Sequence, residues 1–204
     1  MPPLATYEYS IQNDHWDYRG LGSLWTRTGL GSTAQSTVNN KAYYLGGVVH
    51  PGADPQVAGT PGAEPHIVQG LLSFDQNTNQ WTNFSTKDMN NYGTVVDGYL
   101  NLIESVGDEG ILVSYGGFKR PAGQGVSILT AHNVEPSAHV RCRSALILDS
   151  GTNVLMQNSM EYVSVYDIAN NKWYTQQATG DIPEWRMGGC SVVAPAQDES
   201  SYSM

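Results

Sequence analysis

Three short segments of the chain share one pattern: Tyr9-Ser-Ile-Gln-Asn-Asp-His-Trp16, Phe74-Asp-Gln-Asn-Thr-Asn-Gln-Trp81 and Tyr166-Asp-Ile-Ala-Asn-Asn-Lys-Trp173. Each segment places an aromatic residue seven positions before a Trp, and Asp or Asn two positions before that Trp. The intervening residues are rich in Asp, Asn and Gln. Asp and Asn bond their own backbone and tolerate left-handed dihedral angles, so they favour turns. Each segment therefore predicts a hairpin in which two antiparallel strands flank a polar turn.

The residues around these hairpins have the periodicity of strands. Tyr162-Val-Ser-Val-Tyr166 alternates in polarity, and Gly70-Leu-Leu-Ser-Phe74 is short and apolar. Apolar runs that end in a glycine pair precede the second and third hairpins: Tyr43-Tyr-Leu-Gly46-Gly47 and Ile111-Leu-Val-Ser-Tyr-Gly116-Gly117. A glycine pair lets two backbones approach where a side chain would block them. Each unit is thus predicted to hold a strand ending in Gly-Gly, a variable loop and a hairpin.

These features resemble the kelch repeat, in which each unit forms one four-stranded blade of a β-propeller. The residues that carry the resemblance are Gly46, Gly47, Phe74, Asp75 and Trp81 in one unit, and Gly116, Gly117, Tyr166, Asp167 and Trp173 in the next. The Gly-rich and Tyr-rich sequence of these units is most similar to that of fungal kelch proteins. The resemblance implies that these residues have structural roles in an all-β fold.

The spacing of the units departs from the family. The Trp residues stand at positions 16, 81 and 173, so their spacings are 65 and 92 residues, against a kelch period of ~50. The excess lies in residues 48–69 and 118–160. We therefore expect a partial kelch-type β-propeller, a fragment of a longer one, with two complete four-stranded blades and partial blades at each end. The alternative is a complete open β-sheet protein.

The expected single domain divides into the end of a blade at 4–18, a blade at 33–85, a blade at 93–176 with an insertion at 118–160, and the start of a truncated blade at 185–204. In the last part, the run that begins at Arg186 is interpreted as a first blade strand.

The net charge and the distribution of apolar residues limit the classes of partner and the possible cellular locations. The chain has 19 acidic against 10 basic residues and a net charge of −9, which argues against nucleic acid and anionic membrane surfaces. The N-terminal residues lack the basic and apolar regions of a signal peptide. No run approaches the ~20 apolar residues of a membrane span, so we expect no direct membrane insertion. The compartment stays unknown, with a secreted or membrane-anchored parent expected.

Residues suited to catalysis are scattered. No His-Glu-x-x-His pattern or Gly-x-Ser-x-Gly elbow occurs. His139 and Cys142 have a plausible spacing for a metal, but zinc needs three or four ligands. Cys142 and Cys190 are a single pair, which is interpreted as two small buried residues rather than a disulfide framework. We expect no catalytic residue, no metal and no cofactor.

The preferred functional hypothesis is a non-enzymatic binding or scaffold module, because rigid sheets present variable loops for recognition. The partner would be an unknown protein or a glycan. The candidate recognition residues lie in the two long segments: His50, His66, Phe118, Arg120 and Arg141. The alternative is a fragment of a copper- or iron-dependent kelch-fold enzyme, similar to galactose oxidase. A non-functional truncated product is a third reading.

Overall fold

The computed structural model describes residues 5–20, 28–53, 65–121 and 156–204, and its regular structure is almost entirely strand. In chain order the elements are β1 (Ala5–Ser10), β2 (His15–Gly20), β3 (Thr28–Gly29), β4 (Ser32–Ser36), β5 (Lys41–Leu45), β6 (Val48–Val49), the 3-10 turn η1 (Pro51–Ala53), β7 (His66–Ile67), β8 (Leu71–Asp75), β9 (Gln80–Phe84), β10 (Tyr99–Ile103), β11 (Ile111–Tyr115), β12 (Phe118–Lys119), β13 (Met156–Gln157), β14 (Tyr162–Asp167), β15 (Lys172–Gln177), β16 (Ala194–Pro195) and β17 (Tyr202–Ser203).

The three repeated segments each form a hairpin, and the same position turns the chain each time. The residue two positions before the Trp has a positive φ in every copy: 48° at Asp14, 60° at Asn79 and 53° at Asn171. Asp and Asn are the non-glycine residues best suited to this left-handed conformation. The turn then sets the register that places the first aromatic opposite the Trp, as in Phe74↔Trp81 and Tyr166↔Trp173.

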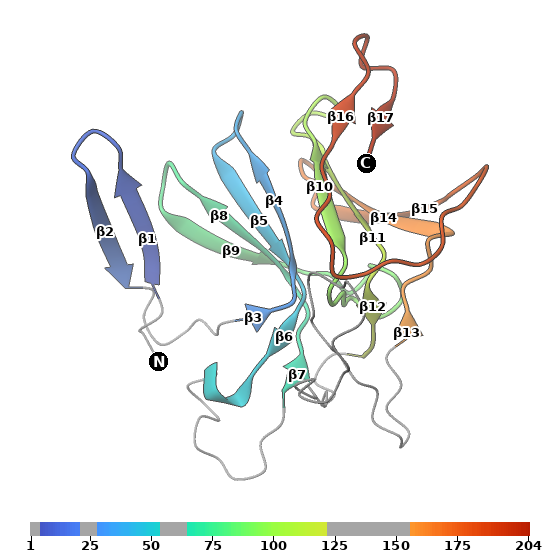
Figure 1. Cartoon of the computed structure of the whole chain (residues 1–204), viewed down its shortest axis with the longest axis horizontal. Helices are drawn as coiled ribbons and strands as arrows, with labels where there is room; N and C mark the ends of the chain where they lie inside the picture. Colours follow the sequence, from blue (N-terminus) through green and yellow to red (C-terminus); the bar gives the residue numbers. More distant parts are fainter. Residues whose placement is uncertain (1–4, 21–27, 54–64, 122–155) are drawn as a thin grey trace, which may run out of the picture.

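Two four-stranded antiparallel sheets make up the body of the molecule. The first sheet has the strand order β4-β5-β8-β9, and the second has the order β10-β11-β14-β15. In both sheets consecutive partners are antiparallel, so each sheet is a meander in chain order. Figure 1 shows the two sheets side by side, with β4 of the first next to β10 of the second. The all-β class and the propeller-like blades predicted from the repeats are confirmed.

The main core lies between the two sheets. From the first sheet it includes Tyr43, Leu45 and Leu71, and from the second it includes Leu100, Leu112, Tyr166 and Trp173, all buried. On β5, β8 and β14 the buried residues alternate with more exposed ones, because successive side chains of a strand point to opposite faces. On β11 three consecutive residues are buried. Each sheet therefore buries one face against its neighbour, as blades of a propeller do.

The two ends of the chain are built differently from the two sheets. The hairpin β1–β2 stands apart at one side of the molecule (Figure 1). At the other end, residues 178–193 form no strand, although a blade was expected to begin at Arg186. This segment follows β10 through single contacts, among them the Ser191 Oγ–Asn101 Oδ1 hydrogen bond of 3.0 Å. A strand needs a ladder of backbone hydrogen bonds, and single contacts do not supply one.

Candidate functional site: the loop end of the two sheets

The glycine pairs mark the point at which each sheet gives way to its long loop. Gly46 and Gly47 have φ values of 63° and 98°, and Gly116 and Gly117 have values of 63° and 70°. A Cβ atom on Gly47 would lie 2.5 Å from the Gly29 carbonyl oxygen. One on Gly117 would lie 2.5 Å from the backbone of Gly98. Both the dihedral angles and the close approach of a second backbone segment exclude a side chain here.

Each glycine pair is tied to the segment that follows its sheet. The Gly47 amide donates to the Val95 carbonyl at 2.8 Å, and the Gly117 amide donates to the Arg186 carbonyl at 2.8 Å. The two loops therefore leave equivalent places in the two sheets. Both begin at one end, which we call the loop end, where β6 and β7 lie near β12 and β13 (Figure 1).

Short strands form the stems of both loops. In the first, β6 pairs with β3 and β7. In the second, β12 pairs with β13, and Phe118 also bridges Val96. The middle parts of the predicted loops, residues 54–64 and 122–155, lie outside the described residues.

One hydrophobic cluster joins the two stems. Its buried members are Val48 and Ile67 from the first stem, with Val96 and Phe118 from the second. Trp185 packs its ring edge against Phe118, with 4.8 Å between ring centroids, and its Nε1 donates to the Gly117 carbonyl at 2.7 Å. The loops thus leave from a shared apolar base rather than from two independent ones.

The candidate recognition residues fall into three groups. His50 is exposed and His66 is half-buried, so both imidazoles are accessible to a partner. Phe118 and Arg120 are buried, with 9% and 3% of their surfaces exposed. The Arg120 backbone accepts from and donates to the Thr94 hydroxyl. Arg141 lies outside the described residues. Phe118 and Arg120 are therefore placed in the base of the loops, beneath any contact surface.

The repeated aromatic and Asp residues make contacts within their own hairpins. The Phe74 and Trp81 rings are 4.8 Å apart, and the Tyr166 and Trp173 rings are 4.9 Å apart. The Asp75 carboxylate accepts the backbone amides of Asn77 and Thr78 at 2.9 and 3.1 Å.

The Asp167 carboxylate makes the equivalent turn contacts. It accepts from the side chain and the backbone amide of Asn170, and these hydrogen bonds hold the pKa of Asp167 below its usual value. Such contacts close a turn and leave no carboxylate aimed into a cleft.

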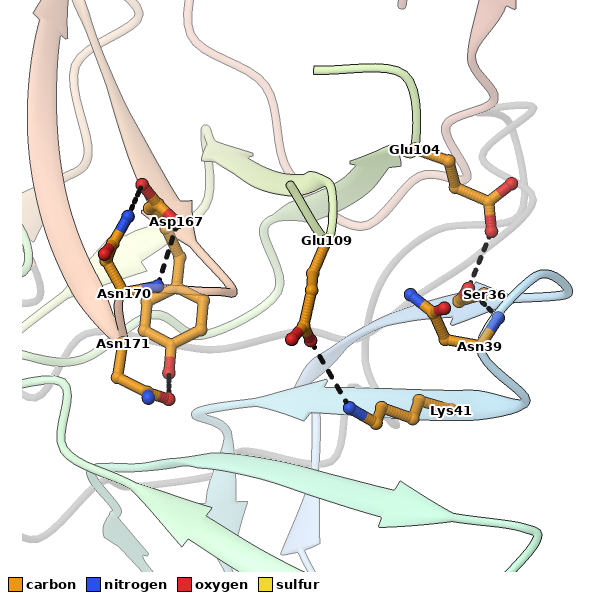
Figure 2. A network of polar contacts seen from close by, with 9 residues as sticks. Ser36, Asn39, Lys41, Glu104, Glu109, Asp167, Asn170 and Asn171 are labelled. Atoms are coloured by element: carbon orange, nitrogen blue, oxygen red, sulfur yellow. Dashed lines mark hydrogen bonds and ion pairs between the residues drawn. The ribbon is translucent and has the colours of Figure 1, made fainter. Parts of the chain in front are cut away.

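At the end of the sheets opposite to the loop end, polar contacts that the sequence analysis did not predict connect the two sheets (Figure 2). The Ser36 hydroxyl donates to Glu104 at 2.7 Å, and the Lys41 ammonium lies 3.6 Å from the Glu109 carboxylate. Burial, followed by the nearby carboxylates of Glu109 and Asp75, raises the pKa of Tyr43 to about 12. The partners are about 68 residues apart along the chain, which is why no spacing rule points to them.

A cavity of about 600 Å³ opens along β4 and β10, and sequence reasoning missed it too. Its walls include the amides of Gln35 and Asn101, the aromatic rings of Tyr44 and Trp81, and Ser191 from the C-terminal segment. Four separate parts of the sequence supply these residues, so only the tertiary structure brings them together.

Neither metal binding nor membrane crossing gains support from the described part of the chain. Among those residues, no three His, Cys, Asp or Glu side chains converge as a metal site would require. His139 and Cys142 lie outside this part, and Cys190 is a free, exposed thiol. No described helix has the length and apolarity needed to span a bilayer.

Known proteins match the chain both in sequence and in structure. No protein-family model matches the chain. Over 54 residues, 26% of the chain, it is 43% identical to a kelch repeat-containing protein of Arthroderma benhamiae. That match spans 8% of the relative's length. The solved structure of YjhT aligns with 95% of the chain and 43% of its own length, at 15% identity and a TM-score of 0.49. The chain thus spans less than half of either protein. The resemblance to the kelch-repeat family is confirmed.

Proposed function

We propose that this kelch-repeat chain is a binding scaffold without catalytic activity, and that its recognition surface is the pair of long loops at the loop end. The observation that carries the proposal is the shared apolar base of the two stems, Val48 and Ile67 with Val96 and Phe118. Because one cluster supports both stems, the two long segments leave the sheets from neighbouring places. Variable loops carried on a rigid scaffold are common recognition surfaces.

The accessible groups near the stems suit recognition of a polar partner. His50 is exposed, and its ring Nδ1 accepts the Gly52 amide at 3.2 Å, which holds the imidazole at the start of the first loop. Lys119 lies beside the Tyr92 ring, with its ammonium 5.8 Å from the ring centroid. A protein or a glycan with hydroxyl, amide or carboxylate groups matches these donors. The glycine pairs and the hairpin Trp residues serve the scaffold in this proposal.

Trimming both loops tests the proposal. Residues 54–64 and 122–155 are replaced by short Gly-Ser turns, which leaves the stems and the apolar base intact. Loop length costs little stability, so the trimmed chain should keep its thermal transition. A partner first captured with the intact chain is then titrated by calorimetry. We expect at least an approximately tenfold loss of affinity, as when hot-spot residues are removed.

The matched control changes the opposite end of the first sheet. Val38 is 73% exposed in the β4–β5 turn, so Val38→Ser should leave both fold and affinity unchanged. If the trimmed chain binds the captured partner as tightly as the intact chain does, the loops are not the recognition surface.

A further inference from the structure

A small pocket lies between the two sheets at the end opposite to the loop end. Its volume is about 190 Å³. The first sheet supplies Lys41, Tyr43 and Ser73 to its lining, and the second supplies Tyr166 and the turn residue Asn171. Its walls are therefore the facing surfaces of two neighbouring sheets, and none of its described lining residues comes from the N-terminal hairpin or the C-terminal segment. We call it the intersheet pocket.

The Tyr43 hydroxyl is the buried polar group of this pocket. Tyr43 is only 3% exposed, and its hydroxyl has no hydrogen-bond partner among the described residues. After burial, the Glu109 carboxylate is the largest cause of the raised pKa of Tyr43. Glu109 also lines the pocket, so the hydroxyl lies on the pocket side of the ring. Buried polar groups are nearly always hydrogen-bonded, so this hydroxyl indicates a place where a bound molecule supplies the partner.

The blade architecture does not require polar side chains at these positions. Counted from the glycine pairs, Lys41 and Tyr43 of β5 correspond to Ile111 and Val113 of β11. The second sheet thus forms the same strand with two aliphatic side chains, and Val113 is buried. The Lys and Tyr are therefore a property of this one intersheet surface rather than of the repeated unit.

Two opposite charges stand at the mouth of the pocket. The Lys41 ammonium lies 3.6 Å from the Glu109 carboxylate, and their side chains are 30% and 49% exposed (Figure 2). A ligand with a net charge is attracted by one of these groups and repelled by the other. A neutral hydroxyl group can donate to the carboxylate and accept from the ammonium, so it suits both. The pair therefore favours a neutral ligand with several hydroxyl groups.

The aromatic walls and the volume limit the size of that ligand. The rings of Phe84 and Tyr166 both line the pocket, with 6.1 Å between their centroids. Small-molecule sites generally combine such apolar walls with a few polar groups that fix the orientation of the ligand. At ~30 Å³ for each water molecule, the pocket has the volume of about six waters. It therefore has room for one small hydroxylated ring and not for a chain of them.

We propose that the intersheet pocket binds a small neutral polyhydroxyl compound of the size of one sugar ring. The Tyr43 hydroxyl and the Lys41–Glu109 pair hold its hydroxyl groups, and its carbon skeleton lies against Phe84 and Tyr166. Two sources supply this chemistry: a free monosaccharide or cyclic polyol, and the terminal sugar of a glycan that enters past the charged pair. The site lies at the opposite end of the sheets from the loop end, so it does not depend on recognition by the loops.

Titration calorimetry of the intact chain tests the proposal with glucose, galactose, mannose and myo-inositol as probes. A ligand of this size is expected to bind with a dissociation constant on the order of 1 mM, at one site per chain. Disaccharides that end in the same sugars separate the two sources. Binding of the free ring alone identifies a small-molecule site, and equal or tighter binding of a disaccharide identifies a site for a glycan end. Failure of every probe to bind at concentrations well above this value would overturn the proposal.

Two variants assign the binding to the pocket. Tyr43→Phe keeps the ring and removes a hydroxyl that has no partner among the described residues, so the thermal transition should be kept while binding weakens about three- to tenfold. Glu109→Gln removes a charged acceptor from the partly exposed mouth and should weaken binding about tenfold. The matched control is Tyr162→Phe, which removes a hydroxyl from a side chain of β14 that is 47% exposed and outside the lining. Unchanged affinity in both pocket variants would overturn the proposal.

Backbone amide NMR shifts locate the bound probe independently of the variants. The probe should shift the amides of Tyr43, Ala169 and Asn171, which line the pocket, and leave those of Val49 and Lys119 at the loop end unchanged. This readout also separates the site from the proposed recognition loops, since either can bind while the other does not. Shifts confined to the loop end would mean that the loops hold the polyhydroxyl compound, and would overturn the assignment to the intersheet pocket.

Discussion

The first and third copies of the repeated hairpin have nearly the same internal geometry and opposite surroundings. The ring pairs are 5.1 Å apart in Tyr9–Trp16 and 4.9 Å apart in Tyr166–Trp173. In each copy the first tyrosine donates to the residue five positions on, Asp14 in one and Asn171 in the other. Yet Trp16 is 62% exposed and Trp173 is 7% exposed.

This difference distinguishes the contacts that form within a single hairpin from the burial that requires a neighbouring sheet. The ring pair, the tyrosine hydrogen bond and the left-handed turn all form within eight residues. Burial of the pair needs a second sheet, which the third copy has and the first lacks among the described residues. The motif therefore predicts a hairpin, but it does not predict whether the Tyr–Trp pair of that hairpin is buried.

The largest expected effect comes from removing the buried Trp. Trp173→Ala should lower the free energy of unfolding by ~3–5 kcal/mol, because it deletes a large core side chain and leaves a cavity. Trp16→Ala should change it by less than ~0.5 kcal/mol, as exposed substitutions do. Urea unfolding at one low protein concentration measures both. Equal losses in the two variants would show that the first hairpin is also packed, contrary to the comparison.

The next effect concerns the glycine pair that precedes the third copy. Gly117→Ala should cost ~2–4 kcal/mol, since it combines a left-handed dihedral angle with a backbone clash. The control is Gly180→Ala, where φ is 83° but no atom lies within 4 Å of the added Cβ. That control should cost ~1 kcal/mol from the dihedral angle alone. Thermal unfolding of the two variants distinguishes crowding from strain, and similar losses would exclude a role for crowding.

A smaller effect is expected from the tyrosine hydroxyls. Tyr166→Phe should cost ~1 kcal/mol, because it breaks a part-buried hydrogen bond to Asn171. Tyr9→Phe should give no measurable change, since its bond to Asp14 is exposed to water.

The dependence of stability on alkaline pH provides a second measurement of the burial of Tyr166. Burial, with Tyr43 and Asp167 nearby, raises the pKa of Tyr166 to about 12, whereas an unfolded tyrosine titrates near ~10. The stability from the neutral buried hydroxyl is thus complete below pH ~10 and is lost as the pH rises toward 12. Tyr166→Phe should reduce this loss, and a variant with an unchanged alkaline transition would contradict the assignment.

The smallest expected effect is a difference in acid sensitivity. The third copy has Asp167 where the first has Ser10. Hydrogen bonds from Asn170 lower the pKa of Asp167, so its contribution to stability is present above the unfolded value of ~3.9 and is lost as the pH falls through the lowered folded value. Stability curves of Asp167→Asn and the unaltered chain should converge at acid pH. Ser10→Ala should shift the curve equally at every pH, and a pH-dependent shift there would break the comparison.

The sequence led to the all-β class and the kelch resemblance because both rest on short-range patterns. Alternating polarity, the spacing of seven and the glycine pairs each depend on residues close together in the chain. The same reasoning named Phe118 and Arg120 as recognition residues from their place in a long segment. Their burial beneath the loops depends on Thr94, Trp185 and the first stem, which no local pattern links to them.

By itself, then, the sequence determined the hairpins, their turns and the places where only glycine is accommodated, because these follow from backbone dihedral angles and neighbouring side chains. The tertiary structure alone decided which Tyr–Trp pair is buried and that both loop stems share one apolar base. Burial depends on atoms brought close by the folding of distant segments, and the spacing of residues along the chain does not record that distance.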